Sequence, residues 1–253
     1  MDRTTLFDEN NYEFNSNSKN GIYLIHGFTN TTYETKNLAE ELSKKGYRTV
    51  AHNLPGHGTT IEECNQTKYY DWLTAVEEGV AKLASDCDKI HIIGSSMGGV
   101  LALHIATMFP IDSLVIAAPV LKFQNEFKTR ILVPLFKNIV PTRIKSSQYK
   151  GGENMQFYGY SSYPNKALNE MRKLTNIVRK KLIKVQCPIL QFYSKADQTC
   201  IMENYNIITD NISSIIKEKL ILKKISHNML VDKKYSDESD LIYKTINKFI
   251  GKF

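Results

Sequence analysis

Short apolar segments alternate with amphipathic segments along most of this chain, and this alternation constrains the fold more than any other feature. Apolar runs bounded by glycine or polar residues predict buried strands at 21–26, 47–51, 89–94, 113–117, 189–193 and 219–222. Between them, apolar residues recur at helical spacing in 33–45, 70–84, 97–108, a segment from about 201, and 237–249. Strands separated by helices form right-handed crossovers, so the pattern predicts an α/β fold whose mostly parallel sheet has helices on both faces.

The composition is that of a globular protein and disfavours nucleic-acid binding. Hydrophobic residues make up 42% of the 253 residues, and the formal net charge is +7. The densest basic cluster, residues 179–181 with Lys184, lies in a predicted helix without interleaved aromatic residues. Such a cluster favours a solvated helix face, so we expect no nucleic-acid partner.

Cysteine spacing and the N-terminal segment bear on cofactors and location. The cysteines form no CxxC pair and have no metal-ligand spacing with histidine, so we expect reduced thiols rather than a cysteine metal site. The first residues lack the basic start and apolar stretch of a signal peptide, and no apolar run approaches the roughly 20 residues that span a bilayer. We therefore expect a cytoplasmic protein without stable membrane insertion.

The segment Gly94-Ser95-Ser96-Met97-Gly98-Gly99 matches the pattern Gly-x-Ser-x-Gly. The pattern is short, but here a predicted strand precedes it and a predicted helix follows it, as a nucleophile elbow requires. A sharp turn at Ser96 leaves room only for small neighbours and holds the hydroxyl at the N-terminus of the next helix, where negative charge is stabilised. The segment predicts Ser96 as a nucleophile.

A serine nucleophile needs a base, and in this arrangement the order along the chain is serine, acid, histidine. His227 is the histidine that follows the serine outside the elbow's own helix, and it lies just past the last predicted strand. The acid is expected in the loop after the preceding strand, which indicates Asp197. Asp210 lies too far along a helix, and Asp232 follows the histidine.

The tetrahedral intermediate of acyl transfer needs two donors for its oxyanion. One is expected to be the backbone N–H of Met97, directly after the nucleophile. The other is expected from the loop after the first clear strand, His26-Gly27-Phe28, where we assign the N–H of Phe28. His26 is then expected to brace the loop.

With these residues in order, the chain resembles the α/β-hydrolase superfamily along nearly its whole length, and most closely its bacterial carboxylesterase and monoacylglycerol lipase branch. The likeness rests on the His-Gly-Phe loop at 26–28, the Leu-Pro-Gly-His-Gly loop at 54–58, the elbow, and a Pro-x-Leu strand before Asp197. Asn53 and Ser226 depart from the Asp and Gly common there. The resemblance implies hydrolysis of short- to medium-chain acyl esters, including monoacylglycerols, through an acyl-enzyme without a cofactor.

Residues 119–186 are too many for a plain connection between two strands. The resemblance implies that they form a helical cap on a core made of 1–118 and 187–253. An apolar cap would bury an acyl chain, although some of its apolar residues are expected simply to pack on the core. The apolar and aromatic residues of this segment are Leu121, Phe123, Phe127, Ile131, Leu132, Leu135, Phe136, Ile139, Phe157, Tyr158, Tyr160 and Tyr163.

Other activities are compatible with the same three residues. A thioesterase, a small-amide or peptide hydrolase and a perhydrolase would use the same triad, and a ligand-binding protein could keep the hydrolase shell. An aminopeptidase would need an acidic group for the substrate amine, and the segment offers Glu126, Glu153 and Glu170. We expect a small-molecule acyl ester as substrate and a monomer or weak homodimer.

Overall fold

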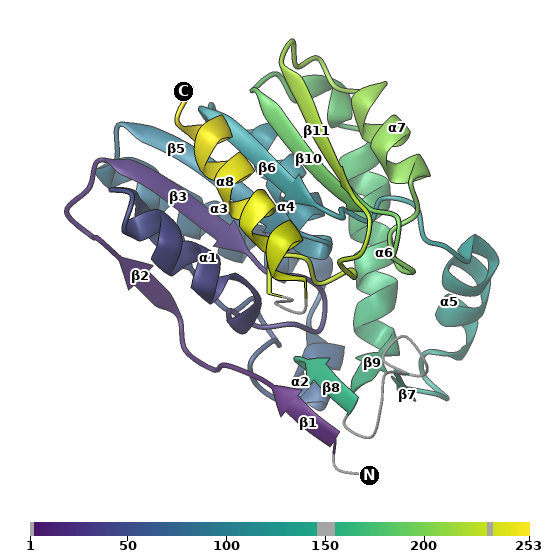
Figure 1. The fold of residues 1–253 in the computed structure, drawn as a ribbon. Helices are drawn as coiled ribbons and strands as arrows, with labels where there is room; N and C mark the ends of the chain where they lie inside the picture. Colours follow the sequence, from purple (N-terminus) through teal and green to yellow (C-terminus); the bar gives the residue numbers. More distant parts are fainter. Residues whose placement is uncertain (1–2, 146–154, 232–234) are drawn as a thin grey trace.

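The computed structural model describes residues 3–145, 155–231 and 235–253. Its centre is a seven-stranded sheet in the order β11-β10-β6-β5-β3-β4-β2, in which the pairings are parallel except that of β2 with β4 (Figure 1). The strands are β2 (Tyr12–Phe14), β3 (Asn20–Ile25), β4 (Arg48–Ala51), β5 (Lys89–Ser95), β6 (Ser113–Ala117), β10 (Ile189–Ser194) and β11 (Lys217–Leu222). The predicted α/β fold with a mostly parallel sheet is confirmed.

Helices cover both faces of this sheet. α1 (Tyr33–Ser43) and α8 (Ser236–Ile250) lie in front of the sheet in Figure 1, and α3 (Tyr69–Asp86) and α4 (Met97–Ala106) lie behind it. α3 buries one stripe, formed by Trp72, Val76, Val80 and Leu83, as its spacing predicts. α4 is buried on every side because it lies against the sheet with α3 and α6 (Asn165–Arg179) packed on it.

Every predicted strand and helix of the core is present, with ends shifted by at most two residues. The basic cluster at 179–184, expected within a helix, instead lies at the end of α6 (Asn165–Arg179), in the turn after it and in a 3₁₀ turn. The last crossover helix, α7 (Glu203–Thr209), begins two residues later than expected. The sequence did not indicate the short elements β1 (Arg3–Leu6), β2 and α2 (Ile61–Gln66). β1 and β2 are set by pairing with distant strands rather than by a local apolar pattern, so periodicity could not reveal them.

The chain between β6 and β10 combines helices with short strands. Its elements are a π-helix (Lys128–Leu132), α5 (Val133–Phe136), β7 (Thr142–Ile144), β8 (Met155–Tyr158), β9 (Ser162–Pro164), α6 and a 3₁₀ turn (Leu182–Lys184). β7 pairs with β9 in antiparallel register, and β8 pairs with β1 in parallel. Within the described part of the chain, no helix is long and apolar enough to cross a membrane.

Two glycines allow α4 to begin directly against the sheet. A Cβ on Gly98 would lie 2.1 Å from the carbonyl oxygen of Ile25, the last residue of β3. A Cβ on Gly94 would lie 2.3 Å from the carbonyl oxygen of Gly98. Both obstacles are backbone atoms, which cannot move aside as a side chain can, so larger residues at either position would push the turn away from β3.

Replacing Gly98 by Ala should therefore destabilise the fold by about 1–3 kcal/mol, the usual cost of overpacking. Urea unfolding at neutral pH measures the effect. Gly251→Ala is the matched control, because its added Cβ would come no closer than 3.2 Å to a neighbouring atom outside its immediate chain neighbours. Equal midpoints for the two variants would show that the close approach of α4 to β3 does not constrain the fold.

Candidate active site

Ser96 lies at the turn between β5 and α4 in a backbone conformation that a serine rarely adopts. Its φ is 52° and its ψ is −113°. Its N–H donates to the carbonyl oxygen of Ala117 at 2.8 Å, which ties the turn to the end of β6. Strained backbone of this kind persists only where its surroundings enforce it, and it concentrates at functional sites.

A chain of hydrogen bonds runs from this serine to a buried carboxylate. His227, in the loop after β11, places Nε2 3.0 Å from Oγ of Ser96 and Nδ1 2.8 Å from Oδ2 of Asp197, in the loop after β10. The structure thus brings together the three residues that the sequence indicated. Of the alternatives, Asp210 caps the end of α7, and Asp232 lies outside the described residues.

The surroundings of Asp197 and His227 determine the charge of each side chain. Burial alone would raise the pKa of Asp197, but His227 and the backbone N–H groups of Cys200 and Thr199 outweigh it and lower the pKa. Burial alone would lower the pKa of His227, but the adjacent Asp197 carboxylate raises it above its ordinary value. Asp197 is therefore a carboxylate that holds Nδ1–H and leaves Nε2 free to accept a proton.

The loop after β3 carries Phe28 next to the elbow. Met97 is the first residue of α4, where backbone N–H groups have no partner within the helix. Gly27 lies so close to the elbow that a Cβ on it would be 3.2 Å from Cβ of Ser96. The loop and the helix start therefore meet at the nucleophile, which is the arrangement that two oxyanion donors require.

Glu34, in the first turn of α1, holds these two segments together. Its buried carboxylate accepts from the N–H of Gly27 at 2.6 Å and from the hydroxyl of Ser95 at 2.7 Å. The sequence alone did not indicate Glu34 as a site residue, because an acidic residue in a first helical turn is usually a surface feature. The only feature of the sequence that could have indicated Glu34 is its position seven residues after the Gly27 turn.

Two further hydrogen bonds position the surrounding loops. His26 accepts from the N–H of Leu54 through Nε2 at 3.0 Å, and its Nδ1 lies 2.9 Å from the carbonyl oxygen of Gly27. It therefore braces the loop, as expected. On the other side of the site, Asn30 donates to the side-chain oxygen of Asn228 at 3.3 Å, which links the Phe28 loop to the His227 loop.

The remaining histidines bond to groups away from the serine. His91 lies against Ser113 and Asn20, and His104 lies against Glu77. His57 is buried beneath the Phe28 loop, and burial lowers its pKa to about 3. Among the residues that the structure describes, no group of three or more histidine, cysteine, aspartate or glutamate side chains could hold a metal ion.

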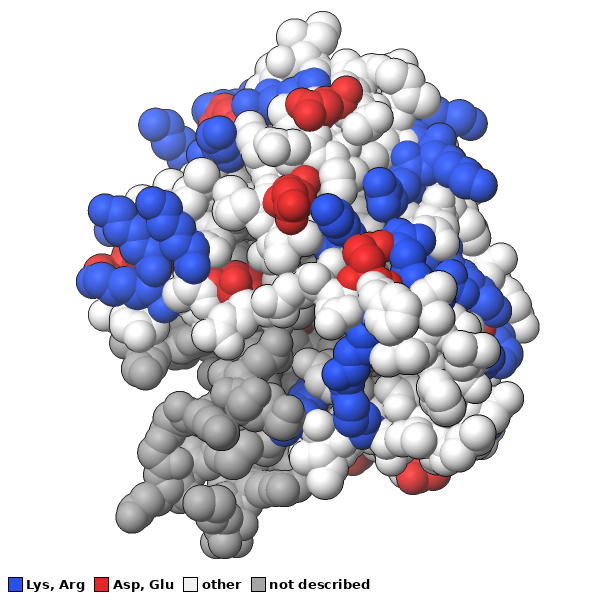
Figure 2. Space-filling view, turned by 90° about the vertical axis from the view of Figure 1, so that its right-hand side faces the viewer, with Lys and Arg blue, Asp and Glu red and all other residues white. Residues whose placement is uncertain are grey.

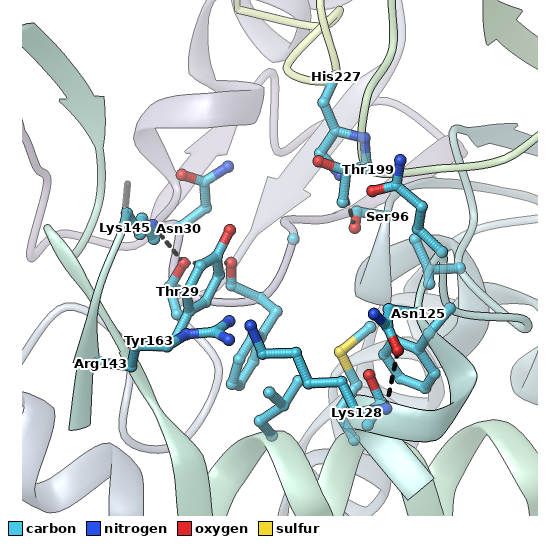
Figure 3. Close-up of a pocket in the computed structure, with 18 of the residues that line it drawn as sticks. Thr29, Asn30, Ser96, Asn125, Lys128, Arg143, Lys145, Tyr163, Thr199 and His227 are labelled. Carbon is cyan, nitrogen blue, oxygen red and sulfur yellow. Dashed lines mark hydrogen bonds between the residues drawn. The ribbon is translucent and has the colours of Figure 1, made fainter. Parts of the chain in front are cut away.

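Ser96 and His227 open into a cavity of about 440 Å³ (Figure 3). Its apolar lining is smaller than the sequence suggested, because Phe127, Leu135 and Ile139 of the β6–β10 segment point into solvent with more than 60% of their surface exposed. The lining residues are Gly27, Phe28, Thr29, Asn30, Ser96, Val120, Phe123, Gln124, Asn125, Lys128, Thr129, Arg143, Ile144, Lys145, Tyr163, Leu168, Met171, Thr199, His227 and Asn228.

The described acidic residues of the same segment that the sequence offered, Glu126 and Glu170, do not line this cavity. Glu126 accepts from the N–H of Phe123 and pairs with Arg130, and Glu170 pairs with Lys173. Glu153 lies outside the described residues. Among the described residues, the cavity therefore contains polar, apolar and basic side chains but no carboxylate.

The serine lies on a strained strand-to-helix turn, and it is joined to a histidine and an aspartate from later loops of a parallel sheet. This arrangement defines a serine hydrolase of the α/β-hydrolase fold. Residues 16–234 match the model of the family Serine aminopeptidase, S33, and the chain belongs to that family.

Several proteins similar to this chain are named as esterases or lipases. It is 31% identical over 216 residues to the thermostable monoacylglycerol lipase of Bacillus sp. (strain H-257), covering 84% of each protein. It is 26% identical over 233 residues to the carboxylesterase of Bacillus subtilis (strain 168), covering 91% of this chain and 92% of that protein. The fold superposes on that of a metagenome-derived lipolytic enzyme with a TM-score of 0.86 at 24% identity, over 97% of this chain and 98% of the other. The chain is therefore an esterase- and lipase-like serine hydrolase.

Replacing Glu34 by Ala should slow covalent labelling of the protein by a fluorophosphonate about tenfold to a hundredfold, because the Phe28 loop and the elbow lose their common acceptor. Glu34→Gln is the matched control, since an amide oxygen can still accept from Gly27 and an amide NH₂ can donate to the Ser95 hydroxyl. The rate of labelling is measured from reactions that are quenched at successive times. An alanine variant that labels as fast as the glutamine variant would exclude a positioning role for Glu34.

Proposed function

We propose that this protein hydrolyses carboxylic esters, with Ser96 as nucleophile, His227 as general base and Asp197 as the acid that orients it. The observation that carries the proposal is the hydrogen-bond chain from Ser96 through His227 to the buried Asp197 at the floor of an open cavity. The esterase and lipase relatives support the same activity.

The geometry suggests a two-step reaction. Oγ of Ser96 attacks the ester carbonyl carbon while Nε2 of His227 takes the hydroxyl proton, and the N–H groups of Phe28 and Met97 stabilise the oxyanion. The tetrahedral intermediate collapses, the C–O bond to the alcohol breaks, and His227 returns the proton to the departing alkoxide. Water then attacks the acyl-enzyme with His227 again as base, which releases the carboxylic acid and restores Ser96.

The size of the cavity favours small substrates. A volume of about 440 Å³ lies in the lower part of the range of small-molecule sites, which is about 300–1,000 Å³. We propose short- to medium-chain acyl esters, with monoacylglycerols among them because one relative is named as a monoacylglycerol lipase. We also propose that residues 119–186 are a cap over a core of 1–118 and 187–253, and that the protein acts in the cytoplasm as a monomer or weak homodimer.

Amide hydrolysis at a free amino terminus fits this cavity less well than ester hydrolysis. An aminopeptidase holds the ammonium group of its substrate with a carboxylate, and the described lining has none. Its charged side chains, Lys128, Arg143 and Lys145, would instead repel an ammonium group.

Ser96→Ala should lower kcat for p-nitrophenyl esters by at least about a thousandfold while the protein stays folded, because triad residues act as a unit. The measurement is hydrolysis of p-nitrophenyl esters from acetate to laurate, together with fluorophosphonate labelling of both proteins. We expect labelling confined to Ser96 and an optimum at a short or medium chain length. A folded wild-type protein that neither labels nor turns over would point to a ligand-binding protein, and preferred cleavage of acyl thioesters would point to a thioesterase.

The pH profile should reflect the raised pKa of His227. The base works only when neutral, so kcat/KM should rise with pH and reach half its plateau above the ordinary histidine value of about 6.5. Asp197→Asn removes the charge that raises this pKa, so the half-plateau should move to lower pH while the rate falls. A flat profile between about pH 5 and 8 would contradict the role of His227 as base.

A further inference from the structure

Three cations line the cavity that contains Ser96. Lys128 extends from the π-helix, and Arg143 and Lys145 come from β7 and its end. In Figure 3 the side chains of Lys128 and Arg143 enter the cavity from opposite walls, and the Lys145 amine lies beside Thr29. A cavity that received only neutral esters would have no need for three positive side chains.

Lys145 is held in place although it is buried. Only 5% of its surface is exposed, and its amine donates to the hydroxyl of Thr29 at 2.7 Å. Thr29 follows Phe28 in the loop that we assign to the oxyanion. Burial lowers the pKa of Lys145 to about 7, against the opposing effect of the nearby Glu34 carboxylate, and a further anion beside the amine would favour its charged form.

The ring of Tyr163, across from Arg143 in the β7–β9 register, lies between two of the cations. The Arg143 guanidinium carbon and the Lys145 amine each lie 5.3 Å from the centre of this ring. Cation–π contacts of this kind orient a positive side chain without neutralising its charge.

Within the described residues, no carboxylate lies within 4.0 Å of any of these three cations. Lys145 is buried and Arg143 is partly buried, whereas Lys128 is exposed. Charges that are buried or partly buried are usually paired, because an unpaired charge loses solvation without compensation. The surface adds to the positive potential, because Lys and Arg outnumber Asp and Glu on the face that carries α5, α6 and α7 (Figure 2). An anion would therefore be both attracted to the cavity and bound in it.

We infer that the ester hydrolysed here carries an anionic group, a carboxylate or a phosphate, which binds among Lys128, Arg143 and Lys145 while the ester carbonyl lies at Ser96. This inference rests on the proposed function and specifies its substrate class. Arg143 offers two parallel donors to such a group, and the lysines act as point charges beside it.

The first test compares pairs of esters in which one member carries an anionic group and the other is neutral. Mono-p-nitrophenyl glutarate carries a free carboxylate on the acyl side, and its methyl ester is the neutral counterpart. 1-Butyrylglycerol 3-phosphate and 1-butyrylglycerol form the equivalent pair on the alcohol side. We expect kcat/KM to favour the anionic member of at least one pair by about tenfold to a hundredfold, the effect of one or two charge-assisted hydrogen bonds. Which pair responds identifies the carboxylate or the phosphate.

Substitutions test whether the cations of the cavity cause the preference for the anionic ester. Lys128→Met and Arg143→Met should each bring the anionic-to-neutral ratio of kcat/KM down toward one, and this ratio is the quantity compared. Lys128→Glu should lower the ratio further, because it places a like charge in the cavity. Lys137→Met is the control, since Lys137 lies in the same segment but does not line the cavity. Lys128 and Arg143 are not fully buried, so these variants should fold even if a Lys145 variant does not.

A binding measurement separates this inference from the proposed function. Isothermal titration calorimetry of the Ser96→Ala protein with glutarate and with inorganic phosphate should show binding. Adding Lys128→Met or Arg143→Met to that protein should weaken the binding, and adding Lys137→Met should not. If neutral esters are cleaved through Ser96 but neither pair shows a preference for the anion, the inference is wrong and the proposed function stands. If no ester is cleaved, the proposed function is wrong, and the titration alone decides whether the cavity binds anions. Absence of binding overturns the inference.

Discussion

The close contact between the start of α4 and the end of β3 is the constraint on which the site depends. Because Gly98 has no side chain, the helix begins against the carbonyl oxygen of Ile25. This brings Ser96 beside the loop that leaves β3, and the bond from the Ser96 N–H to Ala117 fixes the turn from the other side. The strained φ of Ser96 is therefore a result of packing between three parallel strands, and the position of the hydroxyl follows from the sheet itself.

Buried polar groups join the loops around this turn to one another. Glu34 connects the Phe28 loop to the elbow, and Asn30 connects it to the His227 loop. The hydroxyl of Ser194, at the end of β10, donates to the carbonyl oxygen of Ile225 at 2.6 Å, which joins the Asp197 and His227 loops. Hydrogen bonds are directional, so such links fix the orientation of each loop, which apolar contacts would leave free to adjust.

The features that the sequence predicted are those with a strong local pattern. The strands and helices of the core follow from apolar periodicity, and Ser96, Asp197 and His227 follow from a motif and a fixed order along the chain. Glu34 and Lys145 could not be found in this way, because their environment is created by residues distant in sequence. The apolar residues of the β6–β10 segment were also misleading, since the side of a peripheral helix that faces solvent is decided by tertiary contacts, and Phe127 and Leu135 lie on that side.

The two-stranded ribbon of β7 and β9 carries Arg143 and Tyr163 and lies outside the central sheet. Arg143, which would help to recognise a substrate, thus lies outside the sheet whose loops carry the residues that would cleave it. Substitutions of Arg143 or Tyr163 would change the charge and shape of the cavity, and neither residue lies in the turn that carries Ser96. A fold divided in this way can acquire new specificities by a few mutations in the ribbon while the reaction machinery is inherited intact, which makes the ribbon the natural region for laboratory evolution of this protein.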